Sequence, residues 1–339
     1  MAVIIREHIQ WNNWPVWSSA MAPFWATNFT YDFIYPLPKT RGLRDWYEGE
    51  HLHYNQAFPK FKSNPFLFLG TDTAASIQSY HIVRWSGAFA GVPAPPGAPL
   101  IRIKDLDFYT MGDNQIQYNW CMVDLVAILQ QGGYKVLPPA PMPEGVDYLP
   151  PRAMDGIPSP NSDYVDPADA EKAAVAFRGM LQEDFVEQRL DARWWAEDMV
   201  WCGPAGIGDA KSPGQYSAHF LAPLRAAFSE PQLRIDQTLC EGAYCGAHFH
   251  LVAKHTGTWL GQPATGKTVA LRFGMHARVR LGAEVKGCGA CGQLADGWAQ
   301  LDVVAAFAEM GVDLLARARA QHPALLAAAK QPPPAATPE

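Results

Sequence analysis

The chain has 339 residues, of which 48% are hydrophobic, and a formal net charge of -6 at pH 7. This length is enough for two ordinary domain cores. The acidic charge balance and the absence of a Lys/Arg cluster exclude a typical nucleic-acid-binding protein. No apolar run reaches membrane-spanning length, and charges in the N-terminal segment MAVIIREHIQ fall where a signal peptide needs apolar residues, so the sequence predicts a cytoplasmic protein without a membrane partner.

The first half of the chain predicts helices followed by strands. Helical segments are expected around Trp25, and a further helix should end at Phe58. A helix over 124–131 is expected to close the unit. The four strands between them are predicted at 65–70, 75–86, 99–111 and 115–123. Helices followed by an antiparallel meander form an α+β pattern.

The second half repeats the first with an offset of 170 residues. The turn SGAFAGVPAPPG, with Gly87 and Gly91, has the same skeleton as the turn that contains Gly257 and Gly261. Other matching pairs, in chain order, are Trp25 with Trp195, Phe58 with Phe228, Trp120 with Trp298 and Asp124 with Asp302. A repeat of this length and order predicts a duplicated domain.

The repeat and the local composition divide the chain into four parts. We expect a first domain over 1–136, a linker rich in Pro, Gly and Ser over 137–165, a second domain over 166–320, and a disordered tail over 321–339. Asp166 before Pro167 has the form of a helix N-cap, which places the start of the second domain there.

A family resemblance rests on three features of the second half. They are the segment GTWLGQPATGKTV, a strand with a histidine on one face, and a Trp followed four residues later by an Asp that opens a helix. Together they resemble the SnoaL-like polyketide cyclase family over residues 185–315 and, through the repeat, over 10–135. The resemblance implies two tandem NTF2-like cones, each a curved antiparallel sheet covered by helices around a cavity. It also implies acid-base catalysis without a cofactor, and pairing of cone sheets in a homo-oligomer such as a dimer.

The sequence departs from this family at one catalytic position. The family commonly has an acid immediately after the strand tryptophan, and a His or Asp fourteen residues before that acid. Here the first position holds Cys121 or Ala299, which cannot do carboxylate chemistry. The second position corresponds to Asp107 and, through the aligned strand LRFGMHARV, to His276. Both are therefore candidate catalytic residues.

Asp107 has a second carboxylate beside it on the same strand. Alternate strand residues share a face, so Asp105 and Asp107 should point the same way. Two carboxylates in one cavity raise the pKa of at least one of them, as a general acid or base near neutral pH requires. The alternative is that Asp105 lies in solvent at the end of the strand.

The first half also contains histidines and aromatic residues suited to a binding site. His81 and His51 are further catalytic candidates, because histidine exchanges protons near neutral pH. The candidate substrate-binding residues, which offer ring faces and hydrogen bonds to a flat phenolic ligand, are Tyr31, Trp46, Tyr118 and Asn119. The alternative is an aromatic core with hydrogen-bonded histidines. Asp124 and Asp302 are expected to cap helices rather than to catalyse.

Four cysteines of the second half lie in two turns that a four-strand meander places at the same end of the sheet. They are Cys240, Cys245, Cys288 and Cys291. One hypothesis is a structural zinc site with four thiolates, and the other is free thiols in ordinary turns. Disulfides are not expected in a cytoplasmic protein.

The motifs of nucleotide sites, catalytic zinc and serine nucleophiles do not occur in the sequence. We therefore expect no catalytic cofactor. The sequence predicts a lyase, isomerase or cyclase that makes or breaks a carbon–carbon bond by proton transfer, in an aldol or retro-aldol type of reaction. The expected substrate is an aromatic or polyketide-like small molecule, possible examples being lignin-type diaryl compounds. The alternative is a non-catalytic module for small-molecule binding or dimerisation.

Overall fold

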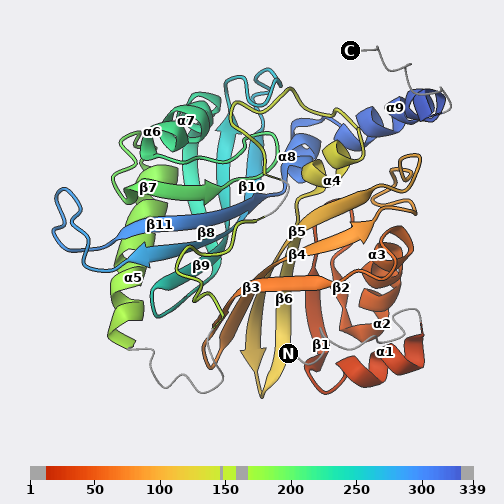
Figure 1. Ribbon diagram of the computed structural model, residues 1–339, viewed down its shortest axis with the longest axis horizontal. Coiled ribbons are helices and arrows are strands. Elements are labelled where there is room, and N and C mark those ends of the chain that lie inside the picture. The colour runs from red at the N-terminus through yellow and green to blue at the C-terminus, as the bar shows by residue number, and fades with distance from the viewer. Residues whose placement is uncertain (1–12, 146–147, 158–166, 330–339) are drawn as a thin grey trace, which may run out of the picture.

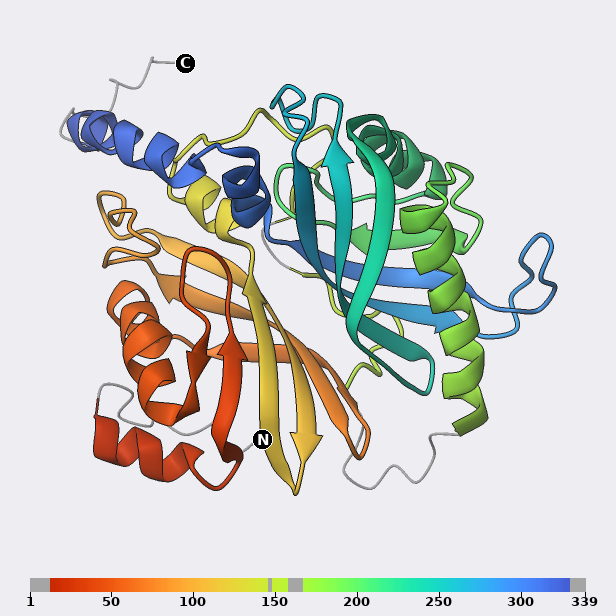
Figure 2. The same cartoon turned by 180° about the vertical axis from the view of Figure 1, so that it is seen from behind.

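The computed structural model describes residues 13–145, 148–157 and 167–329. They form two curved β-sheets, each accompanied by its own helices, and the two sheets lie side by side (Figures 1 and 2). The α+β class and the two tandem units expected from the sequence are confirmed. None of the helices in the described ranges is long and apolar enough to cross a membrane.

The first sheet has six strands in the order β2-β1-β6-β5-β4-β3. Its strands are β1 (Trp25–Asp32), β2 (Thr40–Arg41), β3 (Ser63–Gly70), β4 (Ala74–Arg84), β5 (Leu100–Gly112) and β6 (Gln115–Val123). Its helices are α1 (Trp14–Met21), α2 (Gly42–Trp46), the π-helix η1 (Tyr47–His51), α3 (Leu52–Ala57) and, after the last strand, α4 (Leu125–Gln131).

The second sheet has five strands in the order β7-β11-β10-β9-β8. Its strands are β7 (Trp195–Cys202), β8 (Phe228–Glu241), β9 (Tyr244–His255), β10 (Thr268–Arg280) and β11 (Gln293–Leu301). Its helices are α5 (Pro167–Met180), the π-helix η2 (Leu181–Val186), α6 (Pro213–Tyr216), the π-helix η3 (Ser217–Leu221), α7 (Ala222–Ala227), α8 (Val303–Met310) and α9 (Leu314–Ala329).

The segments that begin at Trp25 and Trp195 are strands, so the prediction of helices there is wrong. β1 pairs in parallel with β6, and β7 pairs in parallel with β11, which makes both sheets mixed instead of purely antiparallel. The sequence WATNFTYD is rich in aromatic and β-branched residues, which favour strands. Parallel pairing is possible because a long stretch of chain connects the paired strands.

Two helix-capping aspartates hold the two halves together. Asp124 Oδ1 accepts a hydrogen bond from the backbone N–H of Ala127 at 3.0 Å, and Asp302 Oδ1 does the same for Ala305 at 2.9 Å. The capping role expected for both is confirmed. Their second oxygens cross to the other half: Asp124 Oδ2 accepts from Ala205 N and Asp302 Oδ2 from Tyr35 N. Each half is thus fixed to a loop of the other through its own cap.

The sheets also pack on one another through apolar side chains. Gly274 lies so close to Leu106 that a Cβ at this glycine would come within 2.1 Å of the leucine Cδ2. One buried cluster takes Leu106 and Phe108 from the first sheet and Trp298 from the second. This sheet face, through which we expected two chains to pair, is therefore covered by the second half of the same chain. Homo-oligomerisation remains a prediction.

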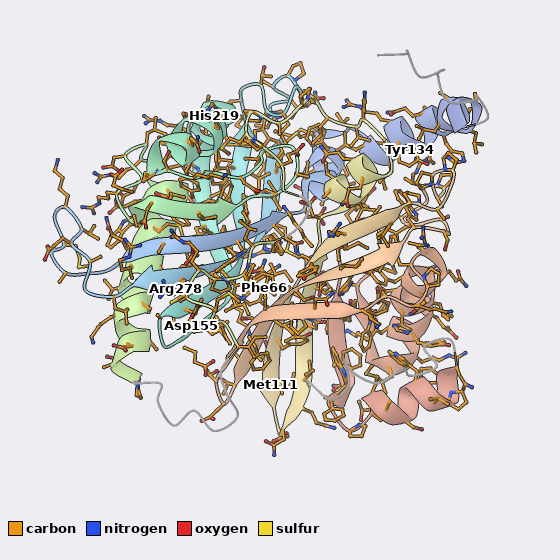
Figure 3. All side chains as sticks on the ribbon, in the orientation of Figure 1. Phe66, Met111, Tyr134, Asp155, His219 and Arg278 are labelled. Atoms are coloured by element: carbon orange, nitrogen blue, oxygen red, sulfur yellow. A yellow bond between two sulfur atoms is a disulfide. The ribbon has the colours of Figure 1, made fainter. Side chains whose placement is uncertain are left out.

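The described part of the predicted linker has no helix or strand and runs along the junction of the halves. Arg152 donates from Nε to Asp296 Oδ1 at 2.6 Å, and Asp155 lies 3.8 Å from Arg278 Nε (Figure 3). Tyr148 is buried. At the C-terminal end, α9 extends to Ala329, so the first part of the predicted disordered tail is helical. Residues 330–339 and the predicted N-cap Asp166 lie outside the described ranges.

Candidate functional site

A cavity of about 170 Å³ lies in the first half, between the sheet and the helices α1 to α3. Its walls are mostly aromatic, with several buried polar groups among the rings. Six residues predicted from the sequence line it, and they are Asp107, His81, His51, Tyr31, Trp46 and Asn119. The structure thus brings together side chains from two helical turns and four strands. Tyr118 and His276 are not among the lining residues.

The floor of the cavity carries two carboxyl groups. Asp105 and Asp107 are alternate residues of β5 and both enter the cavity, so Asp105 does not lie in solvent. One oxygen of each and the Cys121 sulfur all lie within 4.8 Å of one another. Asn119 Nδ2 donates to Asp107 Oδ1 at 2.9 Å. Ser79 Oγ donates to Asp105 Oδ2 at 2.7 Å.

Burial changes the acidity of two carboxyl groups in the cavity. Burial, together with the charge of the neighbouring Asp105, raises the pKa of Asp107 to about 8. Burial also raises the pKa of Glu50 to about 8, although Trp46 Nε1 donates to its Oε2 at 2.9 Å. Two like charges this close in a dry site cannot both form freely. Asp107 is therefore largely protonated near neutral pH.

His81 connects Asp105 to a tyrosine. Tyr54 OH lies 2.7 Å from His81 Nδ1, and His81 Nε2 lies 3.4 Å from Asp105 Oδ2. Burial raises the pKa of Tyr54 well above its ordinary value, so the phenol keeps its proton. In the tautomer with its hydrogen on Nε2, His81 accepts a hydrogen bond from this phenol at Nδ1 and faces the Asp105 carboxylate with Nε2–H. The chain of contacts from Tyr54 through His81 to Asp105 orients the Asp105 carboxylate as a proton acceptor.

His51 lies on the π-helix η1 and is held by its neighbours. Asn55 Nδ2 lies 2.9 Å from His51 Nε2, and the imidazole stacks on Tyr47 at a centroid distance of 5.7 Å. These contacts fix the ring against the helix. His51 is therefore part of the cavity wall, and these contacts are with residues of its own helical segment.

Glu50 and Tyr54 are functional candidates that were not among the site residues predicted from the sequence. Both lie in the segment RDWYEGEHLHYNQAF beside His51. The helix changes from α to π at Tyr47–His51, and this change determines which of the polar side chains enter the cavity. Periodicity at 3.6 residues does not predict that change. Tyr54 follows His51 by three residues, a spacing that already in the sequence places both on one helix face.

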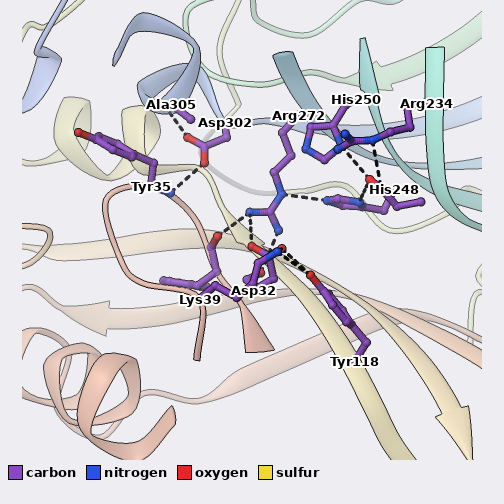
Figure 4. A network of polar contacts seen from close by, with 12 residues as sticks. Asp32, Tyr35, Lys39, Tyr118, Arg234, His248, His250, Arg272, Asp302 and Ala305 are labelled. Atoms are coloured by element: carbon purple, nitrogen blue, oxygen red, sulfur yellow. Dashed lines mark hydrogen bonds and ion pairs between the residues drawn. The ribbon is translucent and has the colours of Figure 1, made fainter. Parts of the chain in front are cut away.

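The two predicted residues outside the cavity have structural partners. Tyr118 donates from its hydroxyl to Asp32 Oδ2 at 2.8 Å and accepts from Lys39 Nζ at 2.9 Å, on the opposite side of the sheet (Figure 4). His276 is fully buried between the sheets, with Nδ1 2.8 Å from Gln78 Oε1 and Nε2 2.8 Å from Ser76 Oγ. Neither contacts the carboxyl pair.

The strand register explains why His276 does not match Asp107. Asp107 pairs with Cys121, the residue after Trp120. In the second half, the residue after Trp298 is Ala299, and it pairs with Met275. Met275 is therefore the counterpart of Asp107. The alignment from sequence is one residue out of register, and a shift of one residue moves a strand side chain to the opposite face.

The second half lacks the polar groups of the cavity. In register order the positions of Glu50, Tyr54, His81, Asp105 and Asp107 are taken by Phe220, Leu224, Leu251, Phe273 and Met275. Phe185 contacts the rings of Phe220, Phe249 and Phe273 at centroid distances of 5.1–5.9 Å. Aromatic side chains thus fill the space that corresponds to the cavity.

The four cysteines of the second half form two disulfides, and the zinc hypothesis for them is wrong. Cys240 is bonded to Cys245, its partner across the β8–β9 hairpin, and Cys288 is bonded to Cys291 within one turn. The two cysteines of each turn are neighbours and bond to each other. None of the four therefore remains as a free thiolate that could bind zinc. Cys121 and Cys202 are free and buried.

Two other groups of described residues have the ligand types of a metal site. One is the carboxyl pair with Cys121, inside the cavity, and the other is Asp236 with His248 and His250. In the second group Arg272 Nε donates to His248 Nε2 at 2.9 Å (Figure 4). The same guanidinium reaches the backbone carbonyl of Asp32 at 2.9 Å. The second group is therefore part of a charged network that joins the halves.

Comparison with known proteins identifies the second half. Residues 176–309 match the family model described as SnoaL-like polyketide cyclase. This similarity is confined to the second half of the chain. The match lies within the predicted second domain, which is the half whose interior is filled by aromatic side chains. No curated protein matches the chain.

Several solved structures resemble part of this chain at low identity. TsrD from Streptomyces laurentii is 16% identical, with 43% of this chain and 97% of that chain covered and a TM-score of 0.34. IdmH from Streptomyces antibioticus is 18% identical, with 39% and 97% covered and a TM-score of 0.32. A SnoaL-like polyketide cyclase from Agrobacterium tumefaciens is 16% identical, with 33% and 83% covered and a TM-score of 0.28. We base no functional conclusion on similarities at this level.

Proposed function

We propose that the first half is a cofactor-independent acid-base enzyme of the lyase, isomerase or cyclase type, acting on an aromatic or polyketide-like small molecule. The observation that carries this proposal is the pair Asp105 and Asp107 at the floor of an aromatic cavity, with the pKa of Asp107 raised to about 8. A protonated Asp107 beside a second carboxyl group offers an acid and a base in the same place. The filled second half has a structural role in this proposal.

The reaction begins with two proton transfers. Asp105, held by Ser79 and the His81–Tyr54 pair, removes a proton from a carbon next to a carbonyl group. Asp107 gives its proton to the carbonyl oxygen, so that an enol forms and the total charge of the site does not change. The enol then attacks a second carbonyl group, or the reverse sequence breaks a carbon–carbon bond. Asn119 keeps Asp107 oriented by donating to its other oxygen.

The cavity limits the size of the substrate. Its volume of about 170 Å³ is below the 300–1,000 Å³ typical of sites for drug-sized ligands. In this conformation it accommodates a ligand with one aromatic ring. A diaryl compound of the lignin type would leave its second ring outside or require a wider opening.

Exchange of carbon-bound protons in a panel of simple ketones tests the proposal. Aryl ketones and β-hydroxy aryl ketones are incubated with the protein in D₂O, and deuterium incorporation next to the carbonyl is followed by mass spectrometry. We expect Asp107→Asn to lower the exchange rate of any responsive compound by about 10²–10⁴-fold, the usual contribution of a general acid or base. Asp113→Asn, in the exposed β5–β6 turn, serves as the matched control.

An unchanged exchange rate in the folded Asp107→Asn variant would refute the assignment of Asp107. If ring compounds bind in the cavity and none exchanges a proton, the protein is a small-molecule binding module instead of an enzyme.

A further inference from the structure

The cavity combines many aromatic rings with several acids. Seven aromatic side chains line it, and they are Trp25, Tyr31, Phe33, Trp46, Tyr54, Phe61 and Tyr109. Three carboxyl groups lie among these rings, namely Glu50, Asp105 and Asp107. Among the described residues that form the walls there is no lysine and no arginine. The ligand therefore meets acids, ring faces and the imidazoles of His51 and His81, without a permanently charged side chain to pair with an anion.

The rings and one of the acids are in direct contact. Trp46 packs on Trp25 at a centroid distance of 4.6 Å and stacks on Tyr31 at 4.7 Å with an interplanar angle of 25°. The same indole donates from Nε1 to Glu50 at 2.9 Å. An indole that donates to a carboxyl group gains electron density on its ring face, and that face attracts cations.

The fold does not require these acids. In the second half, the positions of Glu50, Asp105 and Asp107 are all apolar. That sheet nevertheless forms with the same order of its five strands, and β10 pairs with β11 in the register of β5 with β6. Buried carboxyl groups without a lysine or arginine partner destabilise a protein, and among these three Asp105 has the imidazole of His81 beside it. Three of them in one half, and none at the same positions in the other, therefore point to a ligand that compensates for them.

We propose that the substrate of this cavity carries a small organic cation, an ammonium group on or next to a single ring. This inference rests on the proposed function, since it names the substrate class of the same site. The ammonium group would lie against the rings of Trp25 and Trp46 and pair with the carboxyl groups. Substrates with a carboxylate or phosphate group are disfavoured because they would add negative charge to an acidic, dry site.

A bound cation also changes the protonation of the site. Burial raises the pKa of Glu50 and of Asp107 to about 8, so both are largely protonated at neutral pH when no cation is bound. A neighbouring cation favours the ionised form of a carboxyl group. Binding near neutral pH should therefore release a proton to the solvent and leave a carboxylate base beside the substrate.

Binding of an isosteric pair of probes tests the inference on the full chain. Phenyltrimethylammonium and tert-butylbenzene have nearly the same shape and differ in charge. Calorimetric titrations at pH 7, in phosphate and in Tris, measure both the affinity and the number of protons released. We expect phenyltrimethylammonium to bind at least about tenfold more tightly, and its binding heat to differ between the buffers because a proton leaves the site. Equal or tighter binding of tert-butylbenzene, or no binding of either probe, would overturn the inference.

A matched pair of variants tests whether Glu50 contributes to the binding of the cation. Glu50→Gln retains an acceptor for Trp46 Nε1 and should weaken phenyltrimethylammonium binding about tenfold without affecting tert-butylbenzene. Glu48→Gln, an exposed position on the same helical segment, should leave both affinities unchanged. Unchanged affinity in folded Glu50→Gln contradicts the role of Glu50. Proton exchange that depends on Asp107, together with a preference for the neutral probe, would reject the cation while the proposed function stands.

Discussion

Phe108 and His276 stack on each other between the two sheets, with ring centroids 5.0 Å apart and an interplanar angle of 6°. They occupy the same register position in the two halves, next to Asp107 and Met275 respectively. The contact therefore lies close to an approximate twofold axis that relates the halves. His276 is therefore part of the interface between the two halves.

Replacing His276 with alanine should destabilise the protein by about 2–4 kcal/mol, because it leaves a cavity and removes the hydrogen-bond partner of Gln78 and Ser76. Urea unfolding measures this change. His53→Ala, at an exposed position, should remain within about 0.5 kcal/mol of the unsubstituted protein. A loss below about 1 kcal/mol for His276→Ala would contradict the structural role.

The pH dependence of stability gives a second test of His276. Burial lowers its pKa to about 3, whereas the unfolded chain has the ordinary value of 6.5. Between these values the unfolded state binds a proton that the folded state does not. The free energy of unfolding should therefore fall as the pH decreases from 6.5 toward 3. The fall should be smaller in His276→Ala.

Glu50 should produce the opposite pH dependence. Burial raises its pKa to about 8, above the ordinary 4.5, so the folded state retains a proton that the unfolded state has released between these values. Stability should decrease as the pH rises through this window, by up to about 1.4 kcal/mol per pH unit. Glu50→Gln should be more stable than the unsubstituted protein at pH 7 and differ less at pH 4. Thermal unfolding at both pH values measures this, with Glu48→Gln as the control. A Glu50→Gln variant that is no more stable than the unsubstituted protein at pH 7 would contradict the raised pKa of Glu50.

Arg272 should contribute strongly to the contact between the halves. Its guanidinium is buried and donates to His248 and to the backbone carbonyls of Asp32 and Phe33 (Figure 4). Arg272→Ala should lower the free energy of unfolding by about 3–5 kcal/mol, since it leaves buried partners without a donor. Arg280→Ala, which breaks an exposed ion pair with Asp198, should cost less than about 1 kcal/mol. Similar losses in the two variants would contradict this role.

The disulfides predict the thiol content of the protein. The unfolded, unreduced chain should react with two equivalents of a thiol reagent, at Cys121 and Cys202, and with six after reduction. Six reactive thiols before reduction would mean that neither bond forms. Mass spectrometry of the peptides that contain Cys240–Cys245 and Cys288–Cys291 identifies each bond separately.

Much of the fold could be predicted from the sequence, because it depends on local patterns that occur twice. The glycine turns at Gly87 and Gly257 and the caps Asp124 and Asp302 established the repeat and the meander. The strands at Trp25 and Trp195 were not predicted as such. Each is the parallel partner of a strand far along the chain, and a parallel pair leaves no turn in the sequence to reveal it.

The candidate site could be predicted in part for a similar reason. Alternation along one strand placed Asp105 and Asp107 on a single face, and the structure has them so. The counterpart of Asp107 was misplaced, because a loop-length difference between the halves changes the register by one residue. The contribution of Glu50 depends on a π-helical turn, and the disulfides depend on which side chains become neighbours after folding.

The fusion of both cones in one chain has a consequence for symmetry. Two separate identical subunits would have to keep the same sequence, so each would carry every acid of the site. Here the copies can diverge independently, and one has lost its acids while still covering the back of the other. The expected stoichiometry is therefore one ligand per chain, half of what two equivalent cones would bind, and no cooperativity between cones can arise within the molecule.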